Sequence, residues 1–312
     1  MTGMSGHQTV LYEEALRELR IKPNGVYLDC TFGRGGHSRG ILTRLGESGR
    51  LLATDRDYDA IVSATADELK ADPRFSLHHA CFSELATVAE QSGCHGKLDG
   101  ILMDLGVSSP QLDKAERGFS FLRDGPLDMR MDSQRGPTAA EYLAKVEESE
   151  LARIFFEYGE ERYSRRIAKA IVTQRQSHPL TTTAQLAKLI EDNVPFRDKH
   201  KHPATRCFQA IRIEINQELE QLRTALRLAL EALAPEGRLV VISFHSLEDR
   251  IVKNFIRDEA GAKHDPGKLP VRERDIEQGR LRKIGKAIRA QYDELQANAR
   301  ARSAVMRVAE KR

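Results

Sequence analysis

The sequence predicts an α/β fold in which a doubly wound, mostly parallel sheet carries an inserted all-helical domain. Apolar strand patterns recur at residues 26–30, 50–55, 75–80, 99–105 and 238–243. Helical segments fill the first three gaps, and this alternation is typical of a parallel sheet. The last gap holds about 130 residues of helical pattern, far more than the dozen or so that a crossover needs. An insertion before the last of these strands is therefore expected.

We expect residues 1–112 and 213–312 to form the domain that holds the sheet, and residues 113–212 to form the inserted helical domain, which would recognise the substrate. A helical segment is expected after the second strand, over 58–69, and a long helix over 204–233 should return the chain to the sheet. Residues 303–309 alternate well enough to be a last edge strand. Within the insert, helices are expected at 139–143, 148–158, 161–174 and 184–193.

A glycine-rich turn follows the first strand and predicts a cofactor site. Gly33, Gly35 and Gly36 allow positive φ and close approach of backbone N–H groups, and a helix beginning near His37 would point its positive end at the same place. Asp29, at the end of the strand, could contact the cofactor or brace the turn.

The turn does not match the common nucleotide motifs. A dinucleotide site would continue as G-x-G-x-x-G, but Ser38 stands at the sixth position counted from Gly33. A phosphate-binding loop would need Lys and Ser or Thr after its last glycine, and Ile41 follows Gly40. Both a dinucleotide site and a phosphate-binding loop are therefore disfavoured.

Two further strand ends carry aspartates. Asp55 lies twenty positions beyond Gly35, where an acid can hold the ribose hydroxyls of NAD or of S-adenosylmethionine. Asp104 ends the strand pattern at 99–105, where a dehydrogenase needs no carboxylate but a methyltransferase brings donor and acceptor together. This favours a Rossmann-like methyltransferase sheet that binds S-adenosylmethionine; an NAD-dependent oxidoreductase is the alternative.

Several residues are candidates for contact with the donor or the methyl acceptor. Phe82 follows the third strand and could cover the adenine ring. After Asp104, Ser109 lies in a Ser-Ser-Pro turn where amino-methyltransferases have Asp-Pro-Pro-Tyr, so Asp104 and Ser109 are candidate catalytic residues. His245, after the fifth strand, could be a general base or contact a base edge, with Ser246 as a helix N-cap and Asp249 completing its capping box.

Composition sets broader limits. At 312 residues, 40% hydrophobic and 30% charged, the chain can form one large domain with an elaboration. It has no apolar stretch long enough for a membrane span or a secretory signal, so a cytoplasmic protein is expected. The four cysteines lack C-x-x-C spacing, and adjacent residues His78 and His79 would point to opposite faces of a strand, so no metal site is expected.

Positive charge is concentrated near the end of the sequence. Residues 268–312 hold thirteen Lys or Arg against six Asp or Glu, whereas the whole chain has a net charge of +3. Such a segment is typical of proteins with a polyanionic partner, although solvated helices give the same count. A basic loop at 197–206 could bind phosphates. Arg162, Arg165, Arg166 and Lys169 form a basic helical face that is either a solvated surface or a further RNA contact.

Six motifs spread over the chain together resemble the bacterial ribosomal RNA small subunit methyltransferase H family. The resemblance implies S-adenosylmethionine-dependent N4-methylation of a cytidine in the decoding region of 16S rRNA, with 16S rRNA or the small ribosomal subunit as partner; a homodimer is left open. It places donor contacts at Gly35, Gly36, His37, Asp55, Phe82, Asp104 and Gln111. An RNA-binding assembly factor without turnover is a further alternative. The motifs are 31–37 (TFGRGGH), 104–111 (DLGVSSPQ), 117–121 (RGFSF), 126–131 (PLDMRM), 202–206 (HPATR) and 243–250 (SFHSLEDR).

Overall fold

The computed structural model describes residues 9–195, 202–261 and 279–312. Its contacts divide the chain into two compact units, Met1–Gly106 with Leu219–Arg312, and Val107–Glu218. Both boundaries lie six residues outside the insert limits expected from the sequence. The first unit is called the sheet unit below, and the second the helical unit.

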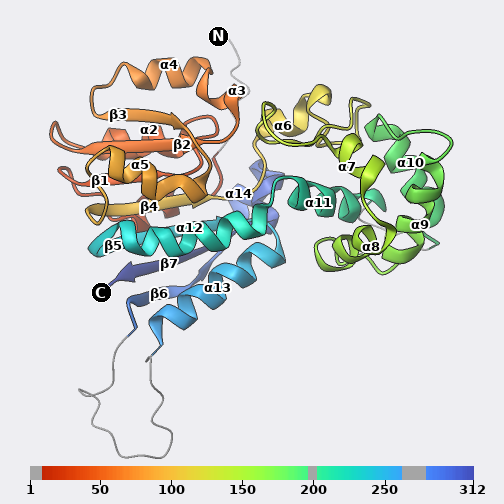
Figure 1. The fold of residues 1–312 in the computed structure, drawn as a ribbon. Helices are drawn as coiled ribbons and strands as arrows, with labels where there is room; N and C mark the ends of the chain where they lie inside the picture. The colour runs from red at the N-terminus through yellow and green to blue at the C-terminus, as the bar shows by residue number, and fades with distance from the viewer. Residues whose placement is uncertain (1–8, 196–201, 262–278) are drawn as a thin grey trace, which may run out of the picture. The chain divides into compact units, whose positions relative to one another are not determined.

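The sheet unit alternates strands and helices along most of its length (Figure 1). Its elements are α1 (Tyr12–Glu18), β1 (Val26–Asp29), α2 (Gly36–Arg44), β2 (Arg50–Asp55), α3 (Tyr58–Ile61), α4 (Ala64–Lys70), β3 (Phe75–His79), η1 (Phe82–Glu84), α5 (Leu85–Gln91), β4 (Leu98–Asp104), α12 (Glu218–Ala232), β5 (Leu233–Ser243), α13 (Ser246–Ala260), β6 (Leu281–Ile288), α14 (Tyr292–Ala297), η4 (Ala299–Ser303) and β7 (Val305–Lys311).

The described strands form one seven-stranded sheet in the order β3-β2-β1-β4-β5-β7-β6. The first five strands pair in parallel, so their carboxyl ends lie along one edge. The strand order reverses between β1 and β4, which is the switch point where doubly wound sheets bind ligands. The predicted Rossmann-like fold class is confirmed.

Successive residues of each inner strand point to opposite faces, and each face carries its own core. Tyr27 packs with α1, α2 and α4, whereas Leu28 packs with α5, α12 and α13. Figure 1 shows α12 and α13 lying across this second face. Because both faces are buried, the inner strands are nearly all apolar, as expected of parallel sheets.

The helical unit contains α6 (Ser109–Asp113), η2 (Ala115–Arg117), α7 (Ala139–Lys145), α8 (Glu148–Glu157), α9 (Ser164–Arg175), α10 (Thr183–Asn193) and α11 (Ala204–Ile215). Its core joins Leu143, Phe155, Ile167 and Ile190 with residues of α11. Helices thus occur in each predicted part of the insert. Its role in substrate recognition stays a prediction.

Two helices predicted as continuous are interrupted. The expected helix over 204–233 ends at Asn216, and Gln217 takes a left-handed conformation with φ of 50° before α12 begins. The Asn216 side chain accepts a hydrogen bond from Met131 N (2.7 Å) and donates to Met129 O (2.8 Å), so it is committed to a neighbouring loop. The segment after β2 likewise divides into α3 and α4, because Ser63 caps a new helix at Ala66 N.

The last strand was predicted in about the right place but at the wrong position in the sheet. β7 lies inside the sheet, antiparallel to both β5 and β6. The edge is β6, which the sequence did not predict because it has an exposed, largely basic pattern. Among the described residues, no helix is both long and apolar enough to cross a bilayer.

Candidate functional site

The glycine turn at the end of β1 is held in place by a buried carboxylate. Asp29 accepts hydrogen bonds from Ser38 Oγ (2.7 Å) and Thr31 N (3.1 Å) and is fully buried. Burial raises its pKa, whereas both hydrogen bonds lower it. Of the two roles expected for Asp29, the structure shows the brace. Gly35 has a φ of 73°, and a Cβ there would lie 2.9 Å from Thr65 Cγ2.

Residues at and just before the start of α1 pack on the start of α2. A Cβ on Gly36 would lie 2.0 Å from Thr9 Oγ1, so glycine is required for Thr9 to approach this closely. The Tyr12 ring stacks on His37 with 6.1 Å between ring centroids. The sequence analysis did not single out Thr9 or Tyr12, because no recognised motif includes them and their contacts depend on the tertiary fold.

Asp55, at the end of β2, joins the glycine turn to the next loop. Its Oδ2 accepts a hydrogen bond from Gly33 N (2.7 Å), and its Oδ1 accepts one from Asp57 N (2.8 Å). The residue that caps α3 is Asp57, which accepts from Asp59 N. Burial raises the pKa of Asp55 to about 6, although these two hydrogen bonds lower it.

Asp104 ends β4 with an unsatisfied carboxylate oxygen. Its Oδ2 lies 3.6 Å from His37 Nδ1, and its Oδ1 is buried with no hydrogen-bond partner among the described residues. Burial, together with the charges of Asp29 and Glu248, raises the pKa of Asp104 well above its usual range. The backbone N–H of Asp104 donates to Thr31 Oγ1 (2.7 Å), which fixes the strand end against the glycine turn.

His37, which lies beside Asp104, is neutral at pH 7. It is 4% exposed, and burial lowers its pKa to about 4. Its Nε2 has no hydrogen-bond partner among the described residues. A neutral imidazole cannot compensate a negative charge on Asp104, so the ionised form of this carboxyl group is best stabilised by a cation or a hydrogen-bond donor from a ligand.

Phe82 begins η1 directly after β3 and is partly buried against the core on the α5 side of the sheet. The two preceding histidines have separate neighbours, since His79 Nε2 lies 3.1 Å from Arg56 O and His78 Nε2 lies 3.4 Å from Ser76 Oγ.

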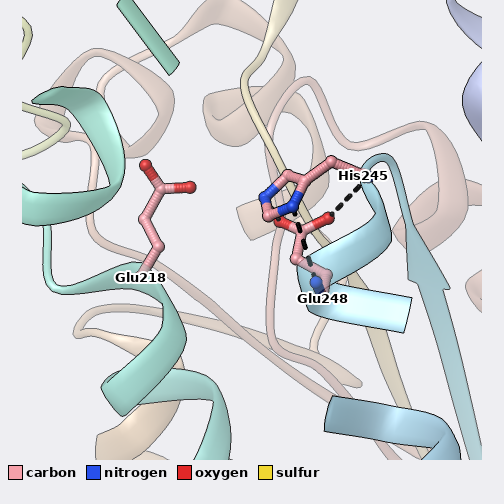
Figure 2. A group of neighbouring side chains, drawn as sticks. All are labelled: Glu218, His245 and Glu248. Atoms are coloured by element: carbon pink, nitrogen blue, oxygen red, sulfur yellow. Dashed lines mark hydrogen bonds and ion pairs between the residues drawn. The ribbon is translucent and has the colours of Figure 1, made fainter. Parts of the chain in front are cut away.

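His245 caps the helix after β5, so the prediction of Ser246 as N-cap is wrong by one residue. Its Nδ1 accepts weakly from Glu248 N (3.5 Å), and Glu248 Oε2 accepts from His245 N (3.3 Å) (Figure 2). Asp249 instead pairs with Arg307 at 2.6 Å. The capping box therefore consists of His245 and Glu248.

Ser109 and Gln111 belong to the helical unit. Both are buried, and Gln111 Oε1 accepts a hydrogen bond from Ser108 N (2.9 Å), which closes the capping box of α6. Their predicted roles toward acceptor and donor stay predictions. Residues 197–201 of the basic loop predicted at 197–206 lie outside the described residues, as do residues 268–278 of the basic segment 268–312.

The motifs at 117–121 and 126–131 form a single packed loop in the helical unit. Arg117 Nη2 donates to Met131 O (2.9 Å), and Arg117 O accepts from Met129 N (3.0 Å). A Cβ on Gly118 would lie 2.4 Å from Pro126 O. These motif residues therefore have a structural role in folding this loop, whatever further role they have.

The carboxyl edge of the sheet unit combines a glycine turn with three strand-end aspartates. An acid at β2 suits two ribose hydroxyls, and an unsatisfied carboxylate at β4 suits a cationic group. S-adenosylmethionine carries both features, as a nucleoside with a sulfonium and an ammonium group. Fold and site together define a doubly wound methyltransferase.

Comparisons with known proteins extend this to a family. The sequence model described as the MraW methylase family matches residues 4–312, so the chain belongs to this family, and its methyl donor is S-adenosylmethionine. Similar proteins named ribosomal RNA small subunit methyltransferase H include those of Pseudoalteromonas atlantica (56% identical, covering 100% of both chains), Alteromonas mediterranea (56%, 98% of this chain and 97% of that one) and Chromohalobacter salexigens (58%, 98% and 91%).

Proposed function

We propose that this protein methylates N4 of a cytidine in the decoding region of 16S rRNA. The small-subunit rRNA substrate is supported by the names of relatives that match over nearly their whole length. The observation that carries the chemistry is the unsatisfied Asp104 carboxylate at the end of β4, beside neutral His37. The base and atom rest on the resemblance of the motifs.

The reaction is a direct transfer. The cytidine N4 lone pair forms the new N–CH₃ bond while the S–CH₃ bond breaks, which leaves a neutral thioether, and N4 then loses one proton to solvent. Because the amine itself attacks, the protein mainly has to orient it. Asp104 is the candidate for that role, and Ser109 and His245 are candidates for further contacts to the acceptor.

Residues of the sheet unit would hold the donor. Gly35 and Gly36 let the backbone approach it, Asp55 would accept from ribose hydroxyls, and Phe82 would cover the adenine. No cysteine adjoins the candidate acceptor residues Asp104, Ser109 and His245 in the sequence, so the covalent route used for carbon-5 methylation of pyrimidines has no evident nucleophile there. A protein that acts on ribosomal RNA would work in the cytoplasm.

The test is mass mapping of modified nucleosides in 16S rRNA from cells with and without this protein. We expect one N4-methylated cytidine in the decoding region to disappear and to return when the wild-type gene is restored. Restoring an Asp104→Ala variant should not return it. If that variant restores small-subunit assembly in the cells but does not return the methyl group, the protein acts as an assembly factor. If the modification pattern is the same in cells with and without the protein, the proposal is wrong.

A further inference from the structure

Helix α9 of the helical unit carries three exposed cations, and a fourth lies in the turn just before it. Arg162, Arg165, Arg166 and Lys169, here called the α9 cationic face, are all exposed. Within α9, Lys169 lies four residues after Arg165 and three after Arg166, so these three side chains share one side of the helix, and Arg162 lies two residues before the helix begins. The other side of the helix is fixed in the core by residues that include Ile167 and Ile171, so the orientation of this face is set by packing.

Within the described part of the chain, the four side chains have no ion-pair partners. Among the residues that the structure describes, none of the four forms a salt bridge or a side-chain hydrogen bond. On the preceding helix, by contrast, Arg153 pairs with both Glu150 (2.6 Å) and Glu157. Charge pairing is thus available to this unit's surface but absent at the α9 cationic face.

The position of these charges does not favour folding. The first turn of α9 contains no acid, whereas α8 begins with Glu148 and Glu150. Cations at the positive end of a helix are unfavourable, and like charges three or four residues apart repel each other. A cluster that lowers helix stability without a compensating contact is typical of a functional surface.

A second set of free cations has a simpler explanation. Lys283, Lys286 and Arg289 lie on and after β6, are exposed and have no ion-pair partner among the described residues. β6 is the open edge of the sheet, and charged side chains there prevent pairing with another chain. The α9 cationic face has no such structural reason.

We propose that the α9 cationic face binds the phosphodiester backbone of the RNA substrate. The inference rests on the proposed function for the identity of the polyanion. Three of its four members are arginines, whose planar group can bind phosphate through two hydrogen bonds. Such contacts hold the RNA in place and do not read its sequence.

The test compares two variants that each lose four positive charges. One is Arg162→Ala/Arg165→Ala/Arg166→Ala/Lys169→Ala; the matched control is Lys97→Ala/Arg223→Ala/Arg227→Ala/Lys253→Ala in the sheet unit, where all four side chains are exposed and lie outside the basic segment 268–312. Binding to fluorescent, protein-free 16S rRNA fragments is measured by anisotropy over a range of KCl concentrations. Methyl transfer to small ribosomal subunits is measured in parallel, with separate KM values for RNA and donor.

We expect the helical variant to raise the KM for RNA roughly tenfold and to reduce the salt slope of binding by about 3, from four lost phosphate contacts. The KM for S-adenosylmethionine should stay unchanged. The melting temperature of the helical variant should be equal to or above that of the wild type, because repulsion between the four cations is removed. A retained or raised melting temperature together with a raised KM for RNA separates a binding role from a structural one. A triple Arg→Lys variant, which keeps the charges, should retain most of the RNA binding.

Three results would overturn the inference. The first is an unchanged KM for RNA and salt slope in the helical variant. The second is an equal loss in the control, which would mean that only total charge matters. The third is a loss seen with assembled subunits but not with protein-free RNA, which would assign the face to a ribosomal protein. If the wild type itself transfers no methyl group to small-subunit RNA, the proposed function fails instead.

Discussion

The backbone N–H of Leu11 donates a hydrogen bond of 2.8 Å to Oε1 of Glu294, which lies 283 residues later in the chain. Leu11 is the N-cap of α1 and has a left-handed φ of 51°, with no capping side chain of its own. Glu294, in α14, therefore supplies the cap from a distant segment. The neighbours Thr9 and Tyr12 contact Gly36 and His37, so this bond also supports the glycine turn that is proposed to hold the donor.

Replacing Glu294 with Ala should loosen the start of α1. Loss of one partly exposed hydrogen bond to a carboxylate is expected to lower protection of the α1 amides by about 1 kcal/mol, measured by hydrogen exchange. The Kd for S-adenosylhomocysteine should rise a few-fold. Glu294→Gln keeps an acceptor oxygen and should behave nearly like the wild type; equal damage in both variants would contradict this role.

Asp104→Asn should uncouple donor binding from RNA binding. The change keeps the shape but removes the charge that a cationic donor would compensate, so we expect a loss of about 2–3 kcal/mol in donor affinity, or roughly 30- to 150-fold. Calorimetry with S-adenosylmethionine measures this, while RNA binding should be retained. Unchanged donor affinity would remove Asp104 from the donor site.

Donor affinity should depend on pH through Asp55, whose pKa is raised to about 6 by burial. Ribose hydroxyls donate more strongly to an ionised carboxylate, so the bound state favours the ionised form. The favourable interaction is then fully present above pH 6 and is lost as the pH falls below it. We expect the Kd of S-adenosylhomocysteine to rise several-fold between about pH 7.5 and pH 5. Asp55→Asn should bind weakly without this dependence, and a flat profile in the wild type would argue against the assignment.

Gly36→Ala should displace Thr9, because the added methyl group would lie 2.0 Å from Thr9 Oγ1. We expect at least a tenfold loss of donor affinity, measured by calorimetry. Adding Thr9→Ala removes that oxygen and should recover part of the affinity. Gly46→Ala, where the nearest atom would be at 3.4 Å, is the matched control and should be neutral. If Thr9→Ala recovers nothing, the loss has another cause.

Asn216→Ala should destabilise the helical unit. The side chain satisfies the buried Met131 N–H and Met129 carbonyl, and leaving both without partners is expected to cost about 2–4 kcal/mol. Hydrogen exchange in α11 measures the effect. Asn193→Ala removes one bond to Leu189 O at the end of α10 and should cost about 1 kcal/mol or less. Equal effects would indicate that the loop contacts are unimportant.

The inner strands could be predicted from sequence because burial on both faces makes them continuously apolar. The strand-end aspartates and the glycine turn could be predicted for a related reason: parallel strands bring their carboxyl ends to one edge. Asp55 shows the limit of this reasoning, since its hydrogen bonds to Gly33 and Asp57 brace the site before any ligand binds.

Features set by distant contacts could not be predicted. The break at Asn216 depends on a loop about 85 residues earlier, and the local pattern there continues as a helix. β6 has few apolar residues because an exposed edge strand buries little. The N-cap of α13 was predicted one residue too late, because serine is a commoner N-cap residue than histidine. Only the position of Glu248 decides between Ser246 and His245.

The inner position of β7 has a consequence for synthesis of the protein. β5 ends at Ser243, but its antiparallel neighbour is complete only at Lys311, about 70 residues later. At translation rates of roughly 5–20 residues per second, one side of β5 would be exposed for several seconds on each nascent chain. During that interval the nascent protein is vulnerable to aggregation, and chaperones would be most useful then.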